Sequence, residues 1–489
     1  MTAEAAPEMD RREFLSAAAA ISFAAWAGGC EGGETVANPE VIVIGAGLAG
    51  MAAALDLVAG GKEVLVLEAR DRPGGRVHTL RTPFTDGLHA EAGAVFIPDH
   101  HDLTLRFARE LALPLRPAWD RRRASAQRYH LSGRTVAADA DGAVDWPVAL
   151  HPRERGLSPE AMANLYLDEL VQEIGDPAHP SWPGPRALRY DNRTLAALLR
   201  ARGASPGALR VMRLGYLEEW GDGIGAVSAL FALRDLALNG GRGGAFVMDG
   251  GTDRLPRAMA ARLSGRIRFG AEVTSVESSG RGVRVDWVEG GMPRSAMARK
   301  AVCALPCPAL RRIRIAPALP AEQRAAVDQL PATSVTRIYL QMRGFEGADA
   351  GMSVPTDTPA MLIATADAGR GDGTALLETF ITGERARRAA ALGADERVAF
   401  ATAWVRRVLP GAGGRVHTGT SYAWDTDPWA HGDYAWFRPG QMRRLLPHLA
   451  VPAGRIHFAG EQTSTSPGWM QGALASGIRA AQEVLAARR

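Results

Sequence analysis

Two short apolar runs near the start of the chain, Val41–Ile44 and Val64–Leu67, enclose a glycine-rich turn and the stretch MAAALDLVAGG. Four consecutive β-branched or leucine residues bounded by turn signals are typical of a strand buried on both faces. The alanine-rich stretch between them favours a helix. The pattern therefore predicts the order strand, glycine turn, helix, strand.

The turn reads Gly45-Ala46-Gly47-Leu48-Ala49-Gly50. In such a G-x-G-x-x-G turn, Gly45 makes the tight bend, Gly47 lets the backbone approach a pyrophosphate, and Gly50 lets the helix pack closely on the strand. The phosphates then lie at a helix N-terminus, where unpaired N–H groups favour negative charge. Glu68, at the end of the second strand, is placed to accept hydrogen bonds from ribose hydroxyls. The sequence predicts a dinucleotide site.

The hydrophobic pattern changes twice further along the chain. Residues 118–244 lack strand alternation and carry helix-compatible stretches at 159–174 and 195–202, which predicts a largely helical region. Alternation returns in RIRFGAEVTSVE and GVRVDWVE, as in half-buried strands. The remaining predicted elements are strands at 337–342 and 375–381, a helix at 396–408, and a strand, loop and helix at the C-terminal end.

Glu68 is followed by Ala69-Arg70-Asp71-Arg72-Pro73-Gly74-Gly75-Arg76. A nicotinamide-binding domain does not need this extension, which suits a cofactor lying along the turn with Arg76 near its phosphates or flavin. The segment resembles the start of the flavin-dependent amine oxidase family, which includes monoamine, polyamine and L-amino acid oxidases and binds FAD.

The resemblance continues from about Pro39 to the C-terminus. It implies an α/β fold in which a Rossmann-like FAD-binding domain of the glutathione-reductase type is interleaved with an α+β substrate-binding domain. The expected parts are a signal and linker at 1–38, the FAD-binding domain at 39–117, 245–316 and 441–489, and the substrate-binding domain at 118–244 and 317–440.

Two C-terminal motifs carry the resemblance further. It implies that Glu461 contacts the ribityl and phosphate region of FAD and that Trp469 and Met470 border the isoalloxazine ring. Tyr434 and Trp469 match the aromatic pair that receives a cationic amine in the family. Monoamine oxidases carry a cysteine bonded to FAD where this chain has Asp433, so FAD is expected to be non-covalent. The residues expected to bind FAD are Gly45, Gly47, Ala49, Gly50, Glu68, Ala69, Arg70, Gly75, Arg76, Val273, Gly460, Glu461 and Met470.

The chain departs from the family at two positions. Where many members place a lysine near the flavin, this chain has Arg337, which cannot titrate as a lysine can, so the electron acceptor is either O2 or a periplasmic redox protein. At the position of the arginine that clamps the substrate carboxylate in L-amino acid oxidases, it has Phe96. That favours an amine without an α-carboxylate. Tyr434, Trp469 and Arg337 are expected to act in catalysis, and Phe96, Tyr434 and Trp469 to bind the substrate.

Composition excludes several classes of protein. The net charge is only +4, the basic residues are scattered arginines with just two lysines, and neither feature indicates a nucleic-acid surface. Three cysteines form neither a disulfide framework nor a structural zinc site, and Cys303 and Cys307 are expected in the core. No metal site is predicted, and His100 and His101 receive no role. Glu218 and Glu219 are either surface acids or a source of one substrate-facing acid.

The N-terminal segment has a separate character. Arg11-Arg12 followed by SAAAAISFAAWAGG resembles a Tat export signal, and the apolar run is too short to span a bilayer. Tat export suits an enzyme that loads its cofactor before it crosses the membrane. Cys30 lies where a lipoprotein cysteine could lie, so a lipid anchor is left open, as is a homodimer.

These observations together predict an exported FAD-dependent amine oxidase that converts an amine to an imine, which hydrolyses to an aldehyde or ketone and ammonia, while O2 becomes H2O2. Three alternatives are left open. They are an L-amino acid oxidase of the same fold, an amine dehydrogenase that passes electrons to a periplasmic protein, and a flavin-binding protein without turnover.

Overall fold

The computed structural model describes residues 39–118, 127–179, 181–240, 243–345, 352–367, 373–410, 412 and 415–486. The predicted export signal and Cys30 lie outside the described residues.

The strands β1 (Val41–Ile44) and β2 (Val64–Leu67), predicted around the glycine turn, belong to a five-stranded parallel sheet. Its strands, in spatial order, are β10 (Ile267–Arg268), β2, β1, β14 (Lys300–Cys303) and β21 (Ile456–Phe458). The two apolar runs predicted as strands pair in parallel, with Val41 opposite Val64. The sheet therefore joins segments from the beginning, the middle and the end of the chain.

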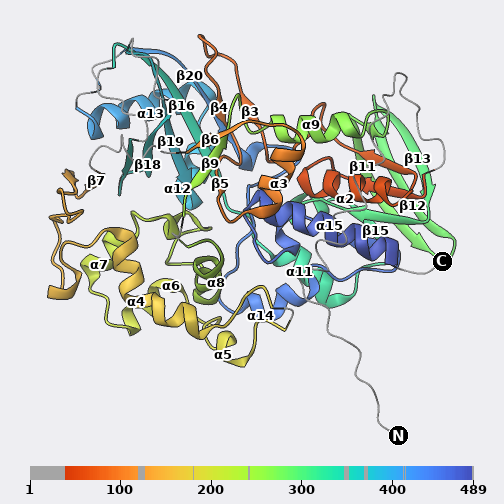
Figure 1. The fold of residues 1–489 in the computed structure, drawn as a ribbon, viewed down its shortest axis with the longest axis horizontal. Coiled ribbons are helices and arrows are strands. Elements are labelled where there is room, and N and C mark those ends of the chain that lie inside the picture. Colours follow the sequence, from red (N-terminus) through yellow and green to blue (C-terminus); the bar gives the residue numbers. More distant parts are fainter. Residues whose placement is uncertain are drawn as a thin grey trace, which may run out of the picture.

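Both faces of this sheet are covered. Val41 and Val43 point into a core shared with α2 (Leu48–Ala59), α9 (Arg254–Arg262) and α15 (Met470–Ala486). Ile42 and Ile44 point the other way, into a core shared with a four-stranded mixed sheet. Figure 1 shows α2 (red) beside α15 (blue), the first and last helices of the described chain. This layering confirms the α/β fold and explains why β1 and β2 are apolar at every position.

This mixed sheet consists of β13 (Met292–Ala298), β12 (Gly282–Glu289), β11 (Ala271–Ser279) and β15 (Arg314–Ala316), in that order. The first three strands pair antiparallel, and β15 pairs with β11 in parallel. Val283 and Val285 on β12 are buried, whereas Arg284 between them is exposed. The alternation that predicted half-buried strands is confirmed.

A second large sheet lies apart from the parallel one. Its order is β17 (Ser353–Pro355), β18 (Leu362–Asp367), β19 (Ala375–Thr382), β16 (Val335–Arg343) and β20 (Arg415–Ala423). Helices α12 (Gly383–Ala390) and α13 (Ala394–Val408) pack on one face. The opposite face of β16 and β19 presents alternate residues, Arg337 and Tyr339 beside Phe380 and Glu378, to a cavity.

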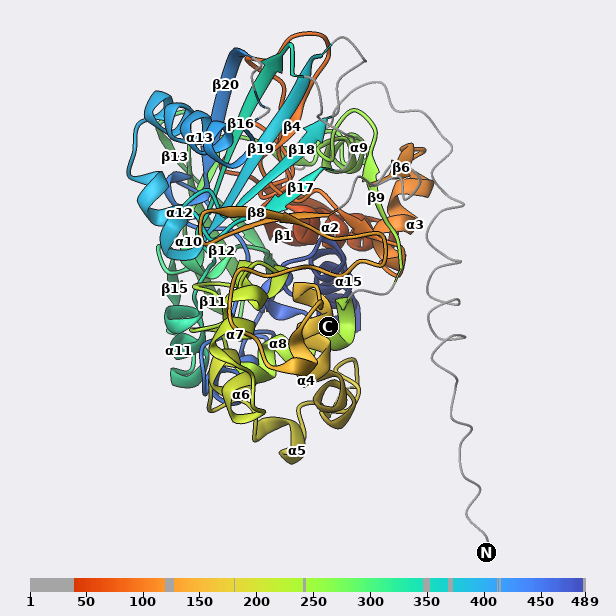
Figure 2. The ribbon, with the colours of Figure 1, turned by 90° about the vertical axis from the view of Figure 1, so that its left-hand side faces the viewer.

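The region 127–240 is largely helical, as predicted, and lies below this sheet in Figures 1 and 2. Its helices are α4 (Pro159–Glu173), α5 (Pro185–Leu188), α6 (Leu195–Ala201), α7 (Pro206–Met212) and α8 (Ala229–Asn239). Side chains of Ser158, Thr194, Ser205 and Ser228 cap four of them by accepting backbone N–H groups.

The described part of 118–244 also contains two short strands that the sequence pattern did not indicate. β7 (Arg128–Leu131) and β8 (Arg134–Ala137) form a hairpin. Its two-residue turn, Ser132-Gly133, has positive φ angles of 56° and 77°, which match the right-handed twist of the strands. Each strand has only four residues, too few for the alternation to appear in the sequence.

Shorter elements complete the described chain. The helices are α3 (Asp102–Glu110), α10 (Cys307–Leu310), α11 (Ala321–Gln329) and α14 (Gln441–Leu445); the 3₁₀ turns are η1 (Pro152–Glu154), η2 (Tyr216–Glu219), η3 (Trp424–Thr426), η4 (Leu446–His448) and η5 (Glu461–Thr463); the strands are β3 (Thr79–Leu80), β4 (Ala90–Glu91), β5 (Ile97–Pro98), β6 (Leu115–Pro117) and β9 (Ala245–Met248). Cys303 and Cys307 are buried, as predicted. Within the described ranges, no helix has the length and apolar character needed to cross a membrane.

Candidate functional site

A cavity of about 2100 Å³ runs from the carboxyl ends of the parallel strands to the helical region and the second sheet. Pockets for a single small ligand usually measure roughly 300–1,000 Å³. The cavity is therefore large enough for a dinucleotide cofactor together with a substrate.

The glycine turn has the geometry that the sequence predicted. Gly45 has a φ of +99°, and a Cβ built on Gly50 would lie 1.9 Å from the carbonyl oxygen of Gly45. A Cβ built on Gly47 would meet no atom within 4 Å, because this position faces the open cavity. Gly50 thus allows close packing of helix on turn, and Gly47 leaves backbone accessible to a ligand.

Glu68 fixes the conformation of this turn. Its carboxylate accepts a hydrogen bond of 2.7 Å from the N–H of Ala46 and one of 2.9 Å from the N–H of Arg70. Burial raises the pKa of Glu68, although these two bonds favour the charged form. The side chain lines the cavity, in the place expected for contact with a ribose.

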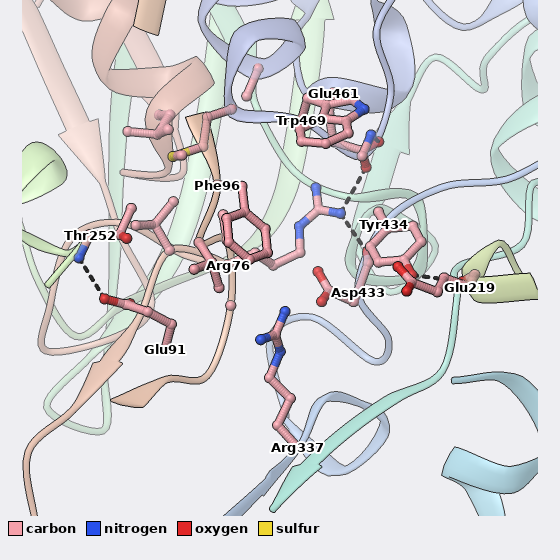
Figure 3. A pocket seen from close by; sticks show the side chains of 18 of the residues that line it. Arg76, Glu91, Phe96, Glu219, Thr252, Arg337, Asp433, Tyr434, Glu461 and Trp469 are labelled. Carbon is pink, nitrogen blue, oxygen red and sulfur yellow. Dashed lines mark hydrogen bonds and ion pairs between the residues drawn. The ribbon is translucent and has the colours of Figure 1, made fainter. Parts of the chain in front are cut away.

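Arg76 connects three parts of the chain at the cavity wall (Figure 3). It forms an ion pair of 2.7 Å with Glu461 and donates a hydrogen bond of 2.5 Å to the carbonyl oxygen of Asp433. Glu461 also accepts a hydrogen bond of 2.9 Å from the N–H of Gly468, just before α15. The resemblance implied that Glu461 contacts the cofactor itself. In this structure Glu461 also holds Arg76 and the start of α15 in place at the cavity wall.

The donor set fits FAD. The cavity combines an accessible glycine backbone, a helix N-terminus, the acid Glu68 and the cation Arg76, which suit a pyrophosphate and a ribose. Gly50 is buried and lies behind the turn. All the other residues expected to bind the cofactor line the cavity, namely Gly45, Gly47, Ala49, Glu68, Ala69, Arg70, Gly75, Arg76, Val273, Gly460, Glu461 and Met470.

Tyr434 and Trp469 both line the cavity, but each is held by a different partner. The Tyr434 hydroxyl donates to the carbonyl oxygen of Glu219 at 2.7 Å, and its ring contacts Trp220 edge-on with centroids 5.2 Å apart. Trp469 makes the same kind of contact with His101, at 5.0 Å. No sequence signal indicated this role of His101.

His101 is buried beneath Trp469. Its Nε2 lies 3.1 Å from Oδ1 of Asn239, the last residue of α8. Burial lowers the pKa of His101 to about 4, so the ring is neutral over the physiological range. His101 therefore supports the position of Trp469 as an uncharged side chain.

Arg337 is fixed in place. It forms an ion pair of 2.7 Å with Glu378 and stacks on the Phe380 ring at 4.5 Å. The partnership with Glu378 keeps its pKa raised despite burial. Arg337 lines the cavity where the family resemblance places a lysine, as a permanent charge that is already neutralised.

Phe96 lines the cavity with 44% of its surface exposed. Figure 3 shows it between Arg76 and Glu91, facing the same space as Trp469. Burial raises the pKa of Glu91 to about 7. The position from which L-amino acid oxidases clamp a carboxylate is therefore occupied by an apolar ring.

The helical region contributes several acidic residues to the cavity, and the sequence pattern did not indicate most of them. Glu219 lines the cavity and is half-buried, so the surface interpretation of this residue was wrong. Glu160, Asp168 and Glu169 on α4 also line it, and no arginine or lysine between 127 and 240 is among its described lining residues. Helical spacing of acids normally indicates a solvated face, which is why these three gave no signal.

The sequence matches the family described as flavin containing amine oxidoreductase over residues 48–485. A Bacillus subtilis (strain 168) protein provisionally named an L-amino-acid oxidase is 29% identical over 91% of this chain and 94% of its own length. The flavin-containing amine oxidase A of Bos taurus is 27% identical over 91% of this chain and 85% of its own. The structure of cyclohexylamine oxidase from Brevibacterium oxydans IH-35A is similar with a TM-score of 0.77 and 26% identity, and the match covers 92% of this chain and 99% of that one. The chain therefore belongs to the flavin-containing amine oxidoreductases and is an FAD-dependent enzyme that oxidises amines.

Proposed function

We propose that the enzyme oxidises an amine without an α-carboxylate, using non-covalent FAD and passing the electrons to O2 to give H2O2. The imine product then hydrolyses to an aldehyde or ketone. The observation that carries this proposal is the absence of a cation available to a carboxylate on the described substrate side of the cavity.

Every arginine among the described lining residues already has a partner. The pairs are Arg70 with Asp427, Arg76 with Glu461, Arg116 with Asp249, Arg312 with His431, and Arg337 with Glu378. A substrate carboxylate would have to compete with these acceptors or lie unpaired among acids, which is costly in a desolvated site. A neutral amine has no such cost, and an ammonium would lie beside acids that favour its charge.

The protein's own contribution is position and environment. Tyr434 and Trp469 present aromatic surface to the substrate, and their partners Glu219 and His101 fix them. Phe96 and the neighbouring apolar wall exclude water from the reacting carbon. FAD, when bound, supplies the redox chemistry by accepting hydrogen and an electron pair from the carbon that carries nitrogen.

Two features of the chain bear on the cofactor and the acceptor. Asp433 has no nucleophilic sulfur, which supports non-covalent FAD. Arg337 is held by Glu378 and keeps its charge, so it cannot act as a lysine that gains and loses a proton. O2 is the proposed acceptor, and a periplasmic redox protein is the alternative.

The test is anaerobic mixing of the yellow protein with matched pairs such as phenethylamine and L-phenylalanine, followed by admission of air. Bleaching by the amine alone supports the proposal, and bleaching by the amino acid alone contradicts it. Return of colour in air with release of H2O2 identifies O2 as the acceptor. Very slow return supports the dehydrogenase, and no bleaching by any reduced organic compound supports a protein without turnover.

We also propose export through the twin-arginine segment at Arg11-Arg12. Replacement of both arginines by lysine is expected to retain the protein in the cytoplasm with its flavin bound. Unchanged recovery from the periplasm would contradict this proposal.

A further inference from the structure

The adjacent acids of η2, Glu218 and Glu219, have opposite environments. Glu218 accepts a hydrogen bond of 2.9 Å from Arg213 and another of 2.9 Å from the N–H of Ile224. Both oxygens of Glu218 are therefore satisfied away from the cavity. Glu219 lines the cavity, and among the described residues no hydrogen bond or ion pair reaches its carboxylate.

The backbone of Glu219 is nevertheless held firmly. Its carbonyl oxygen accepts the Tyr434 hydroxyl at 2.7 Å, and Trp220 packs against the rings of Tyr434 and Phe231. The N–H of Gly221 donates to the Thr333 hydroxyl at 3.1 Å. A free carboxylate is thus attached to a fixed point beside an aromatic residue of the site, as Figure 3 shows for Glu219 and Tyr434.

The charges that face Glu219 come from four other elements. They are Arg337 on β16, Glu378 on β19, Glu160 on α4 and Asp235 on α8. Arg337 is the cation of this group, and Glu378 already pairs with it at 2.7 Å. Desolvation and the remaining acids raise the pKa of Glu219 to about 7. The surroundings of the Glu219 carboxylate therefore contain more acidic than basic groups.

Asp433 is the other acid near Tyr434, and it is compensated differently. Burial raises the pKa of Asp433 to about 6, but Arg76 and Arg337 both favour its charged form, and Figure 3 places its side chain between these two arginines. Arg76 reaches the same residue through its backbone carbonyl. Asp433 therefore already has positive charge on two sides, whereas Glu219 faces the substrate space.

We propose that Glu219 receives the substrate as an ammonium ion and takes one proton from it, leaving the neutral amine in the part of the cavity lined by Tyr434 and Trp469. This inference rests on the proposed function. One N–H bond breaks, one carboxyl O–H bond forms, and nitrogen keeps the electron pair as its lone pair, so no oxidant or reductant is needed. The desolvation that favours a protonated carboxyl also disfavours a charged ammonium, which brings the two groups closer in basicity.

The binding test uses the FAD-loaded enzyme and two ligands of the same shape. Benzyltrimethylammonium is a cation without a removable proton, and neopentylbenzene is its neutral counterpart. Flavin absorbance changes report the binding of each. The variant Glu219→Gln is expected to bind the cation about tenfold or more weakly and the neutral ligand unchanged, because only the charge is removed.

The kinetic test is the rate of anaerobic flavin reduction by benzylamine as a function of pH. In the wild-type enzyme this rate is expected to fall on the acid side with an apparent pKa near 7. In Glu219→Gln the bound ammonium has no base to take its proton, so this fall is expected to move to higher pH. Glu219→Asp keeps a carboxylate and is expected to keep the fall at a lower rate. Loss of the fall in Glu219→Asp would overturn the proposal even if Glu219→Gln does not load flavin.

Glu218→Gln is the matched control, since it alters the neighbouring acid outside the cavity. It is expected to lower the melting temperature and to keep both the cation preference and the acid fall. An unchanged preference and an unchanged fall in Glu219→Gln would overturn the role of Glu219 alone. Failure of every amine to bleach the wild-type flavin would instead contradict the proposed function.

Discussion

The two sides of the cavity are built on different principles. On the cofactor side, the turn from Gly45 to Gly50 exposes backbone to the cavity, and three charged side chains each have a partner. Glu68 accepts hydrogen bonds from two backbone N–H groups, and Arg76 forms an ion pair with Glu461. On the substrate side, the helical region contributes acids without cations, and the carboxylate of Glu219 has no partner among the described residues.

This difference shows how one cavity serves two ligands. A cofactor that stays bound benefits from a site whose groups are already positioned, because little ordering remains to be paid when it binds. A substrate that must enter and leave benefits from a group whose charge it completes only while present. FAD binding should therefore respond most to changes in the shape of the cofactor side, and substrate binding to changes in the charge of the substrate side.

The largest effect is expected from Gly50→Ala. The added Cβ would lie 1.9 Å from the Gly45 carbonyl oxygen, so strand, turn and helix must separate. Overpacking of this kind costs about 3 kcal/mol or more. Thermal unfolding of the flavin-free protein should show a large decrease in melting temperature, and flavin should not be retained on purification.

Gly47→Ala is the matched comparison on the same turn. Its Cβ would meet no protein atom within 4 Å, so the flavin-free protein should melt like the wild type. FAD affinity, measured by titration, should nevertheless fall because the methyl group occupies the space of the ligand. Equal FAD affinity of Gly47→Ala and wild type would contradict the conclusion that FAD binds against this turn.

Glu461→Ala should be the next most damaging change. It leaves Arg76 without its carboxylate in a largely buried position, and breaking a buried pair costs about 3–5 kcal/mol. Chemical denaturation of the flavin-free protein measures this cost. The double variant Arg76→Met with Glu461→Ala should recover part of the loss, whereas strictly additive losses would show that the pair does not couple.

Phe96→Arg tests the substrate side by adding the missing cation. A bidentate, charge-assisted contact with a carboxylate should raise kcat/KM for L-phenylalanine by roughly 10–100-fold. The same change should lower kcat/KM for phenethylamine, since it places positive charge near an ammonium. Phe96→Leu is the uncharged control. No gain on the amino acid would indicate that position 96 does not reach the substrate carboxylate.

The smallest effect concerns His101. Its pKa is about 4 in the folded protein and 6.5 in the unfolded chain, so the unfolded chain binds the proton first as pH falls. Stability from the neutral ring is therefore lost between pH 6.5 and 4, by about 1 kcal/mol at pH 5.5. As the pH falls from 6.5 to 4, the wild type loses this stability and His101→Gln does not. The melting temperature of His101→Gln relative to that of the wild type should therefore rise as the pH falls.

The sequence predicted the strand, turn and helix that form the cofactor side well because their signals are local. A turn such as Gly45–Gly50 needs particular residues at fixed spacing between a strand and a helix, and Glu68 ends the next strand. The same holds for the α/β layering, since apolar runs such as Val41–Ile44 have few other places in a fold. The division of the chain into two domains stays a prediction.

The substrate side could not be predicted in the same way. Glu219 and Glu218 are identical and adjacent, and only the tertiary positions of Arg213 and Ile224 decide which one is satisfied. The support of Trp469 by His101 likewise joins residues far apart in the chain. Such pairings depend on how distant elements pack together, and this packing cannot be read from the local pattern of a single sequence.

The packing of α15 on α2 has a consequence for synthesis of the protein. A Cβ on Gly477 would lie 2.1 Å from the carbonyl oxygen of Ala49, so the last helix closes directly onto the first. A ribosome makes β1 and the glycine turn long before β21, Glu461 and α15. The flavin site is therefore incomplete until α15 has been made, and retention of flavin shows that translation has passed this helix.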